Sequence, residues 1–167
     1  MTGPASGDAL GAGSSNPLGA AFDWLAHAQD QASQAHLEWV SGVALLPLGR
    51  RFSAVCLSAR LVHAGVGATD RDTVNATLAE LLHGPVIHNS LLHTYHALIT
   101  PYPPARWAYG EIAPMLSSGQ FLSVPAADLT GPTGLRWAVR PHSAGVLCSV
   151  PAVAALVALS LRPGGSR

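Results

Sequence analysis

Residues Ser41–Leu57, "SGVALLPLGRRFSAVCL", contain two short apolar runs that are separated by a glycine and two arginines. The runs Val43–Leu48 and Phe52–Leu57 are predicted to be strands, because the second alternates between two faces and turn residues lie between them. The turn at Gly49 and Arg50 would join them as a hairpin. Because helical patterns precede and follow this hairpin, the sequence indicates an α+β fold.

Three segments carry the capping residues and spacing of helices. Residues 16–34 begin with an Asn-Pro pair, which is typical of an N-cap and a first turn. Thr69 and Asp72 have the spacing of a capping box and precede a helical apolar pattern. Ser149, followed two positions later by a proline, opens an apolar segment that is predicted to be the last helix.

The remaining segments are short and partly β-branched. "GPVIHNS" (84–90), "LLHTYHALIT" (91–100) and "GQFLSVPA" (119–126) are predicted to be strands, and Trp137 is placed on a last one. We therefore expect one sheet of short, mainly antiparallel strands, with the hairpin near the N-terminus and about three flanking helices.

We expect residues 16–162 to form one α+β domain. The preceding segment 1–15 is small, flexible and without periodicity, so it is predicted to be a disordered leader, and 163–167 a flexible tail. Cys56 and Cys148 are isolated thiols, and no secretory signal is recognised at the N-terminus, which favours a reducing cytoplasm. No membrane partner is expected.

The charge balance excludes one class of function. Nine arginines and nine acidic residues cancel, so the chain has no global positive field for unspecific binding to nucleic acid or anionic lipid. Charged residues make up only 11% of the chain and hydrophobic ones 49%. This composition favours a tightly buried fold or an apolar surface that meets a partner, so a homo-oligomer or a protein partner stays open.

Four histidines, His83, His88, His93 and His96, fall within fourteen residues, and imidazole is a common zinc ligand. If residues 92–100 form a strand, His93 and His96 point to opposite faces, because side chains alternate along a strand. Separate histidines are the preferred interpretation. No metal site is therefore predicted.

Asp70 and Asp72 have the spacing of a two-carboxylate metal motif for phosphoryl or nucleotidyl transfer. Both also lie in the first turn of a predicted helix, where carboxylates meet free N–H groups and the positive end of the dipole. Capping explains both residues. The chain also lacks the GxSxG, GxxxxGK[ST] and GxGxxG motifs, so no catalytic residue is predicted.

Arginines stand beside each other or beside tryptophan at several places. Arg50 and Arg51 could fork onto a phosphate, although charged residues of a turn commonly face water. Arg106 precedes Trp107, and residues 136–137 form a similar pair. In such a pair the tryptophan can stack on a base and the arginine can bind a phosphate, whereas tryptophan in a small domain more often anchors the core. Both interpretations stay open.

Three stretches, in this order along the chain, carry a resemblance. They are "GVALLPLGRRF" (42–52), "HTYHALITP" (93–101) and "SSGQFLSVPAA" (117–127). Together they resemble the N-terminal domain of bifunctional DNA primase-polymerases, a branch of the archaeo-eukaryotic primase superfamily, over roughly residues 20 to 160. The chain is also similar to small stand-alone proteins of high-GC bacteria in which "LPxGRRF", "GPV", "ARW" and "WxVxP" recur.

The resemblance implies a divalent metal that is held by a carboxylate pair on the strand before the histidine. Here that strand, "GPVIHNS", contains no Asp or Glu. The implied third acidic residue and an arginine would fall near Pro114 and Leu116, where Glu111 is the nearest carboxylate. His93 has the position of a nucleotide-contacting histidine. Without its carboxylates, two-metal nucleotidyl transfer loses nucleophile activation and the charge clamp, so we expect no primase or polymerase activity.

The sequence thus predicts a catalytically degenerate, primase-polymerase-like domain that needs no cofactor and acts by binding a nucleotide, a nucleic acid or a protein. The expected nucleotide or nucleic-acid contacts are Arg50, Arg51, His93, Arg106 and Trp107. One alternative is an interaction module that forms a homo-oligomer without a nucleotide ligand. Another is a metal-dependent nucleotidyl transferase or nuclease with a rearranged site at Asp70, Asp72 and His93.

Overall fold

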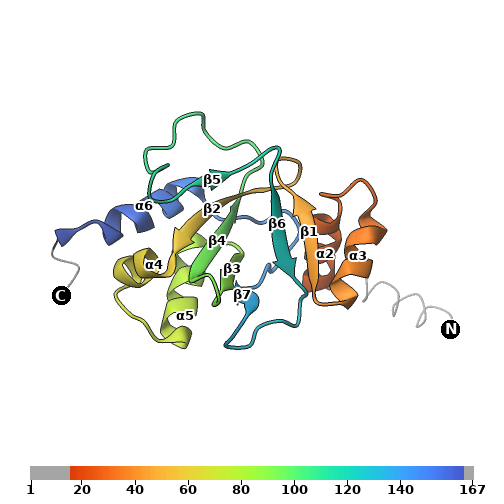
Figure 1. Cartoon of the computed structure of the whole chain (residues 1–167), viewed down its shortest axis with the longest axis horizontal. Coiled ribbons are helices and arrows are strands. Elements are labelled where there is room, and N and C mark those ends of the chain that lie inside the picture. Colours follow the sequence, from red (N-terminus) through yellow and green to blue (C-terminus); the bar gives the residue numbers. More distant parts are fainter. Residues whose placement is uncertain (1–15, 164–167) are drawn as a thin grey trace, which may run out of the picture.

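The chain folds into two antiparallel sheets with helices on both sides, as the computed structural model shows for residues 16–163 (Figure 1). This part of the chain contains five helices and seven strands, which confirms the expected α+β class. The sequence predicts one sheet and about three helices, whereas the strands of these residues form two sheets and five helices accompany them. The predicted leader, 1–15, and residues 164–167 of the predicted tail lie outside the described residues.

The larger sheet has the strand order β5-β2-β4-β3-β7, and every neighbouring pair is antiparallel. Its strands are β2 (Ser53–Ser58), β3 (Val86–Asn89), β4 (Thr94–Ile99), β5 (Met115–Leu116) and β7 (Leu135–Val139). The smaller sheet pairs β1 (Val43–Pro47) with β6 (Phe121–Pro125). The helices are α2 (Pro17–Ala26), α3 (Ala32–Val40), α4 (Ala59–Val66), α5 (Arg71–Leu82) and α6 (Val150–Ser160).

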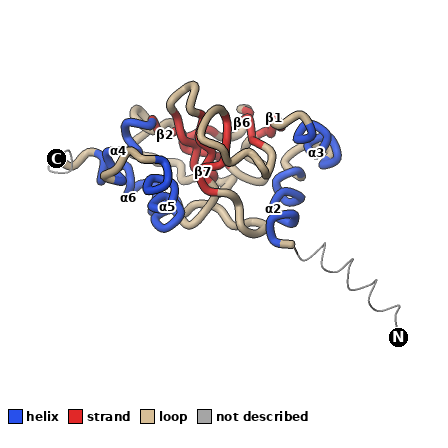
Figure 2. The backbone as a smooth tube through the Cα atoms, turned by 90° about the horizontal axis from the view of Figure 1, so that it is seen from below, coloured by secondary structure: helices blue, strands red, loops and turns tan. Residues whose placement is uncertain are grey.

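Each face of the five-stranded sheet contributes to a separate hydrophobic core. One core lies between this sheet, the small sheet and helices α2 and α3, and it includes Leu46, Leu98 and Trp137. The other lies under α4, α5 and α6 and includes Val55 and Leu78. Figure 2 shows these two groups of helices on opposite sides of the strands. Because successive side chains of a strand point to opposite faces, the same strands serve both cores.

Three aromatic rings connect the two sheets with helices α2 and α3. The ring of Phe22 meets the ring of Trp39 at 5.0 Å and that of Trp137 at 5.7 Å between centroids, both edge to face. The indole N–H of Trp39 donates to the Val124 carbonyl at 3.0 Å, and that of Trp137 to the Pro125 carbonyl at 3.0 Å. The polar edge of each tryptophan therefore has a partner inside the core.

The two strands around Gly49 form as expected, but they do not pair with each other. Strand β1 pairs with β6, and β2 pairs with β4 and β5. The turn is closed by a hydrogen bond from the Gly49 N–H to the Phe52 carbonyl (2.8 Å). Gly49 has a φ of 97°, and a Cβ atom there would lie 2.2 Å from Ser118 Oγ. The chain thus changes direction at a glycine that packs on the loop before β6, and β2 enters the larger sheet.

Side chains occupy the outer edge of β1. The Leu45 N–H donates to Glu38 Oε1 at 2.9 Å, and Gln29 Nε2 donates to the Leu45 carbonyl at 2.9 Å. The hydrogen bond from Leu45 is the main cause that lowers the pKa of Glu38. A carboxylate and an amide therefore take the backbone groups that an edge strand otherwise leaves open.

The first helix is shorter than predicted. The sequence predicts a helix through residue 34, but α2 ends at Ala26 and α3 begins at Ala32. Between them, the Ala28 carbonyl and the Asp30 carboxylate both accept from Arg50. The segment between the helices therefore makes a tertiary contact instead of continuing the helical turns.

The other two predicted helices begin close to their expected residues. The N-cap of α5 is Asp70, whose carboxylate accepts from the Thr73 N–H at 3.0 Å, rather than the predicted Thr69. Ser149 is the N-cap of α6, as predicted, and accepts from the Ala152 N–H at 3.3 Å. Of the helices in residues 16–163, none has the length and apolar character that crossing a membrane requires.

Candidate phosphate-binding cleft

A cavity of about 510 Å³ lies beside the turn between β1 and β2. Its walls come from helix α2, this turn, the segment after β4 and the loop before α6. The lining includes Trp24, Arg50, Arg51, Thr100, Tyr102 and Cys148. No carboxylate belongs to the described lining, although two arginines and two aromatic residues do. We call this cavity the arginine cleft; such a lining favours an anionic ligand that also has a planar or apolar part.

Arg50 is fixed at the rim of the arginine cleft by internal contacts. Its Nη1 lies 2.5 Å from Asp30 Oδ1 and 3.3 Å from the Ala28 carbonyl oxygen. The same nitrogen makes both contacts, so the other N–H groups of the guanidinium remain for a ligand. Both side chains of the ion pair are largely exposed, and exposed ion pairs contribute little to stability. The ion pair with Asp30 therefore orients the Arg50 guanidinium, while most of its positive charge stays available to a ligand.

Arg51 is held by an aromatic ring. Its Cζ atom lies 5.8 Å from the centre of the Trp24 ring, which is a cation–π distance. Both side chains are half-buried. Among the described residues no carboxylate forms an ion pair with Arg51. The guanidinium is thus oriented while its charge has no acidic partner in this part of the chain.

Tyr102 contributes an exposed aromatic ring to the cleft. The residue is 81% exposed, and its N–H donates to Thr100 Oγ1 at 3.3 Å. It stands directly after β4, between two prolines of the sequence "PYPP". An exposed ring beside two guanidinium groups is a surface on which a base can stack.

Cys148 forms part of the cleft wall but is not an active nucleophile at neutral pH. Its thiol donates a hydrogen bond to the Pro85 carbonyl at 3.3 Å. Burial raises the pKa of this thiol to about 12, so it is protonated under ordinary conditions. Because the thiolate is the reactive form of cysteine, Cys148 serves as a small apolar wall residue.

His93, a predicted nucleotide contact, lies far from the arginine cleft. It is exposed in the turn between β3 and β4 and has a φ of 56°. Thr100 of the cleft follows the other end of β4. Six residues of extended chain, 94–99, separate the two, which corresponds to roughly 20 Å. The structure therefore does not bring His93 into the cleft with Arg50 and Arg51, and its contact with a nucleotide stays a prediction.

Arg106 and Trp107, the other predicted contacts, belong to the loop between β4 and β5. The Trp107 indole N–H donates to the Ala113 carbonyl at 2.7 Å, and its ring meets Tyr109 edge to face at 5.5 Å. Trp107 also lines a separate cavity of about 400 Å³ that is formed by its own loop. Arg106 is exposed. Trp107 thus anchors this loop, and neither residue lines the arginine cleft.

The clustered histidines of the sequence are dispersed in the fold. His83 ends helix α5 with a φ of 63°. His88 pairs across the strands with Tyr95, and His96 pairs with Ile87, so His88 and His96 face opposite sides of the sheet. In residues 16–163 no three His, Cys, Asp or Glu side chains are placed to hold one metal ion.

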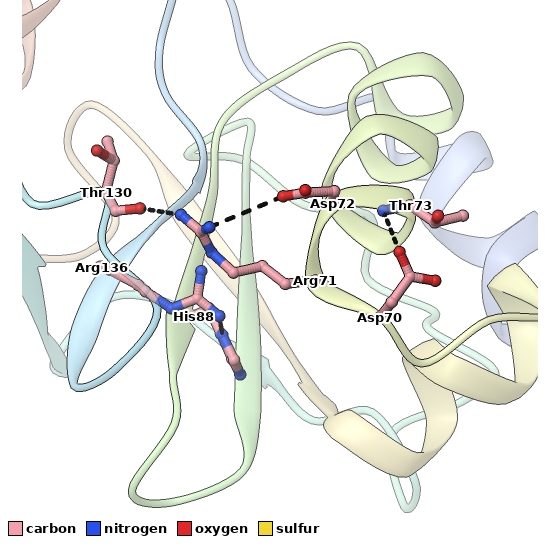
Figure 3. Close-up of polar contacts among 7 residues, drawn as sticks. All are labelled: Asp70, Arg71, Asp72, Thr73, His88, Thr130 and Arg136. Atoms are coloured by element: carbon pink, nitrogen blue, oxygen red, sulfur yellow. Dashed lines mark hydrogen bonds and ion pairs between the residues drawn. The ribbon is translucent and has the colours of Figure 1, made fainter.

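The two aspartates of "DRD" have helix-terminal roles (Figure 3). Asp70 caps α5, and its hydrogen bonds with Thr73 lower the pKa of its carboxyl. Asp72 lies in the first turn, is 94% exposed and reaches Arg71 at 3.7 Å. This agrees with the capping interpretation. Asp70, Asp72 and His93 form no metal-binding group among the described residues, which is a correction to the rearranged-site alternative.

Sequence reasoning missed the two aromatic residues of the arginine cleft. Trp24 belongs to a predicted helix, and its spacing says nothing about the arginine of a later turn. Tyr102 could have been noticed, because prolines on both sides hold a residue in extended, exposed chain. The cleft therefore combines one predicted pair, Arg50 and Arg51, with residues that only tertiary structure brings near. Comparison of the chain with protein-family models, curated proteins and solved structures finds no match.

Proposed function

We propose that this protein binds a nucleotide in the arginine cleft, with the phosphate group at Arg50 and Arg51 and the base against Trp24 or Tyr102. The observation that carries this proposal is a concave site with two arginines, two aromatic rings and no carboxylate among its described lining residues. Guanidinium groups form paired, charge-assisted hydrogen bonds with phosphate, and aromatic side chains stack on bases. The end of a nucleic-acid strand also offers a phosphate group and a base.

The resemblance to primase-polymerase domains supports the same ligand class. The arginine pair of the cleft belongs to "GVALLPLGRRF", the first of the three resembling stretches. Strand β3, which has the position of the metal-binding strand, carries no Asp or Glu. We therefore propose a degenerate primase-polymerase-like domain that binds its ligand without nucleotidyl transfer.

Arg51→Ala should weaken the binding of ATP by about tenfold or more, because a hydrogen-bonded guanidinium–phosphate contact is lost. Arg51 makes a cation–π contact and no ion pair with a described residue, so its removal should leave the fold intact. Isothermal titration calorimetry at low salt measures the effect. The affinity of the unaltered protein should also fall as the ionic strength rises.

Two further variants make this test specific. Arg106→Ala removes the same charge outside the cleft, and we expect the affinity to change by less than about twofold, because distant exposed charges are screened. Asp30→Asn removes the negative charge beside Arg50 but keeps an oxygen that accepts from it, so Arg50 stays in position and binding should tighten slightly. If Arg51→Ala and Arg106→Ala weaken ATP binding equally, or if the unaltered protein binds neither ATP nor a short single-stranded DNA, the proposal is wrong.

A second candidate function is self-association through the outer face of the small sheet. Val43, Leu45 and Phe121 point outward from β1 and β6 and are 38%, 52% and 59% exposed. Pro47, opposite Phe121 in the register, extends this apolar face. The chain has no net charge, so two copies would not repel each other at long range. We propose a second copy of the chain as the occupant of this face.

Phe121→Glu should convert such an assembly to monomers, because it places a charge inside a desolvated apolar contact. Sedimentation velocity over a range of protein concentrations measures the mass. Leu91→Glu, at a more exposed apolar position in the β3–β4 turn, is the control and should not change the mass. A monomeric unaltered protein at the highest concentration would exclude this candidate.

A further inference from the structure

Arg136 of strand β7 is a buried arginine with unsatisfied donors. The residue is only 3% exposed. Its Nη2 meets His88 Nδ1 on the neighbouring strand β3 (Figure 3). Its Nε and Nη1 atoms are buried and have no hydrogen-bond partner. Buried donors of a charged group almost always have partners, and the described residues supply none for these two N–H groups, so a bound water or ion has to satisfy them.

No acidic side chain neutralises Arg136 in the described part of the chain. The ion pairs found there involve other basic residues: His36, Arg50 and Arg71. Burial lowers the pKa of Arg136, and the positive charge of Arg71 lowers it further. A buried charge without a counter-charge is strongly unfavourable. The fold therefore maintains an uncompensated positive charge beneath the first turn of α5.

Arg71 places a second guanidinium group beside Arg136. Figure 3 shows Arg71 extending from the first turn of α5 toward Arg136 and the Thr130 carbonyl. Arg71 donates to this carbonyl and lies 3.7 Å from the exposed carboxylate of Asp72. The Arg71 side chain is 40% exposed, so it can change its contacts without disturbing the core. Two neighbouring guanidinium groups repel each other unless an anion lies between them.

His88 is the third nitrogen-bearing side chain of this group: its Nδ1 accepts from Arg136 Nη2, so the proton of the neutral imidazole lies on Nε2, which can donate. Its ring stacks on Tyr95, with 4.1 Å between centroids and 7° between planes. Burial, followed by the charges of Arg136, His63 and His93, lowers the pKa of His88 to about 4. The imidazole is therefore neutral at pH 7 in the unliganded protein. A bound anion that accepts from Arg136 Nη2 in place of His88 Nδ1 would leave that nitrogen free to be protonated and would favour the protonated form.

We propose that Arg71, Arg136 and His88 form a binding site for one phosphate group, free or esterified, which supplies the missing counter-charge of Arg136. We call it the phosphate site. Tyr95, which packs on His88, and Thr100 of the arginine cleft are five residues apart along β4, so about 16 Å separates the two sites. The proposal therefore goes beyond the nucleotide function and does not depend on it.

The test compares thermal unfolding in sodium phosphate and in sodium chloride at equal ionic strength and pH 7. Phosphate should raise the unfolding midpoint of the unaltered protein by about 5 °C at saturating concentration. Arg71→Gln and Arg136→Met should lose this rise. Arg140→Gln, an exposed arginine just after β7, is the matched control and should keep it. In chloride, Arg136→Met should be at least as stable as the unaltered protein, because it removes an unsatisfied buried charge.

A pH series identifies the role of His88. Sulfate is the probe, because it carries two negative charges throughout this pH range, whereas the charge of phosphate itself changes with pH. Its affinity should rise as the pH falls from about 7 to about 5, and His88→Gln should flatten this rise. The groups that face His88 are Arg136 from β7, Tyr95 from β4, His63 from α4 and His93 from the β3–β4 turn. The two other histidines remain in His88→Gln, so the difference between the proteins reports His88.

The outcomes distinguish a free phosphate ion from an esterified phosphate group as the ligand, and they include results that overturn the proposal. If inorganic phosphate and glycerol 3-phosphate both raise the unfolding midpoint, the phosphate site accepts an esterified group; if only inorganic phosphate raises it, the site takes the free ion. An equal rise in the unaltered protein, Arg71→Gln, Arg136→Met and Arg140→Gln, or no rise in any of them, overturns the proposal. Because Arg71 is exposed, its variant keeps the test valid even if Arg136→Met does not fold. Phosphate stabilisation without ATP binding in the arginine cleft would refute the nucleotide function alone.

Discussion

Trp137→Ala should lower the free energy of unfolding by about 4 kcal/mol, as expected for the loss of a large buried aromatic side chain. Trp137 is only 2% exposed and meets Phe22 of α2 within the core between the two sheets. Its indole N–H donates to the Pro125 carbonyl of the small sheet. Removal of the ring leaves a cavity at the point where both sheets and α2 meet. Urea denaturation followed by circular dichroism measures the loss.

Two comparisons show which part of the Trp137 side chain matters. Trp137→Phe keeps an aromatic ring but leaves the Pro125 carbonyl without its donor, and we expect a loss of about 1–2 kcal/mol. Trp107→Ala removes a half-buried ring that anchors only its own loop, so its cost should stay below about 2 kcal/mol. A cost for Trp107→Ala equal to that of Trp137→Ala would contradict the assignment of Trp137 as the link between the sheets.

Gly84→Ala should destabilise the fold by about 3 kcal/mol, because the added methyl group has no space. A Cβ atom at Gly84 would lie 2.2 Å from the Cys148 backbone nitrogen and 2.4 Å from the Leu147 carbonyl carbon. Backbone atoms cannot rotate away as the end of a flexible side chain can. The segment between α5 and β3 would therefore have to separate from the segment before α6. Chemical denaturation measures the change.

Gly131→Ala is the matched control for Gly84→Ala. Gly131 lies in the loop before β7, and nothing lies within 4 Å of a Cβ atom built there. Its φ is not positive, so alanine is tolerated by the backbone. We expect a change of less than about 0.5 kcal/mol. Equal losses in the two variants would show that close packing at Gly84 is not the cause.

Local patterns were sufficient for the parts of the fold whose stability is decided by neighbouring residues. Ser149 was recognised as a cap because a hydroxyl before an apolar helix satisfies a free N–H group. The strand in 92–100 follows from partly β-branched residues between turn signals. Such features depend on a few adjacent positions, so one sequence is enough to predict them.

Pairing between distant segments could not be read in the same way. Strand β1 has an adjacent strand that could complete a hairpin, yet it pairs with β6, more than seventy residues later. The choice depends on Ser118, which packs on Gly49, and on the Leu48 N–H, which donates to the Gln120 carbonyl at 2.9 Å. Likewise, helix α2 ends at Ala26, and the segment that follows it supplies two acceptors to Arg50 of a distant turn. No local rule contains these contacts.

The candidate sites show the same division. Arg50 and Arg51 could be proposed from the turn in which they stand, but their distance from His93 depends on the direction in which β4 runs. Strand alternation predicts that Arg136 and Trp137 face opposite sides of the sheet. It cannot predict that both sides are covered, so a buried arginine without a counter-charge is visible only in the folded chain.

The side chains of Glu38 and Gln29 on the edge of β1 limit how copies of this chain can join. Their carboxylate and amide bind the N–H and the carbonyl of Leu45 as one more strand would, so an incoming chain finds these central backbone groups already occupied. Growth of an endless ribbon by strand addition at that edge is thereby blocked. We expect any association through the apolar face of the small sheet to end at a closed pair, visible in sedimentation as one discrete species instead of a continuous series.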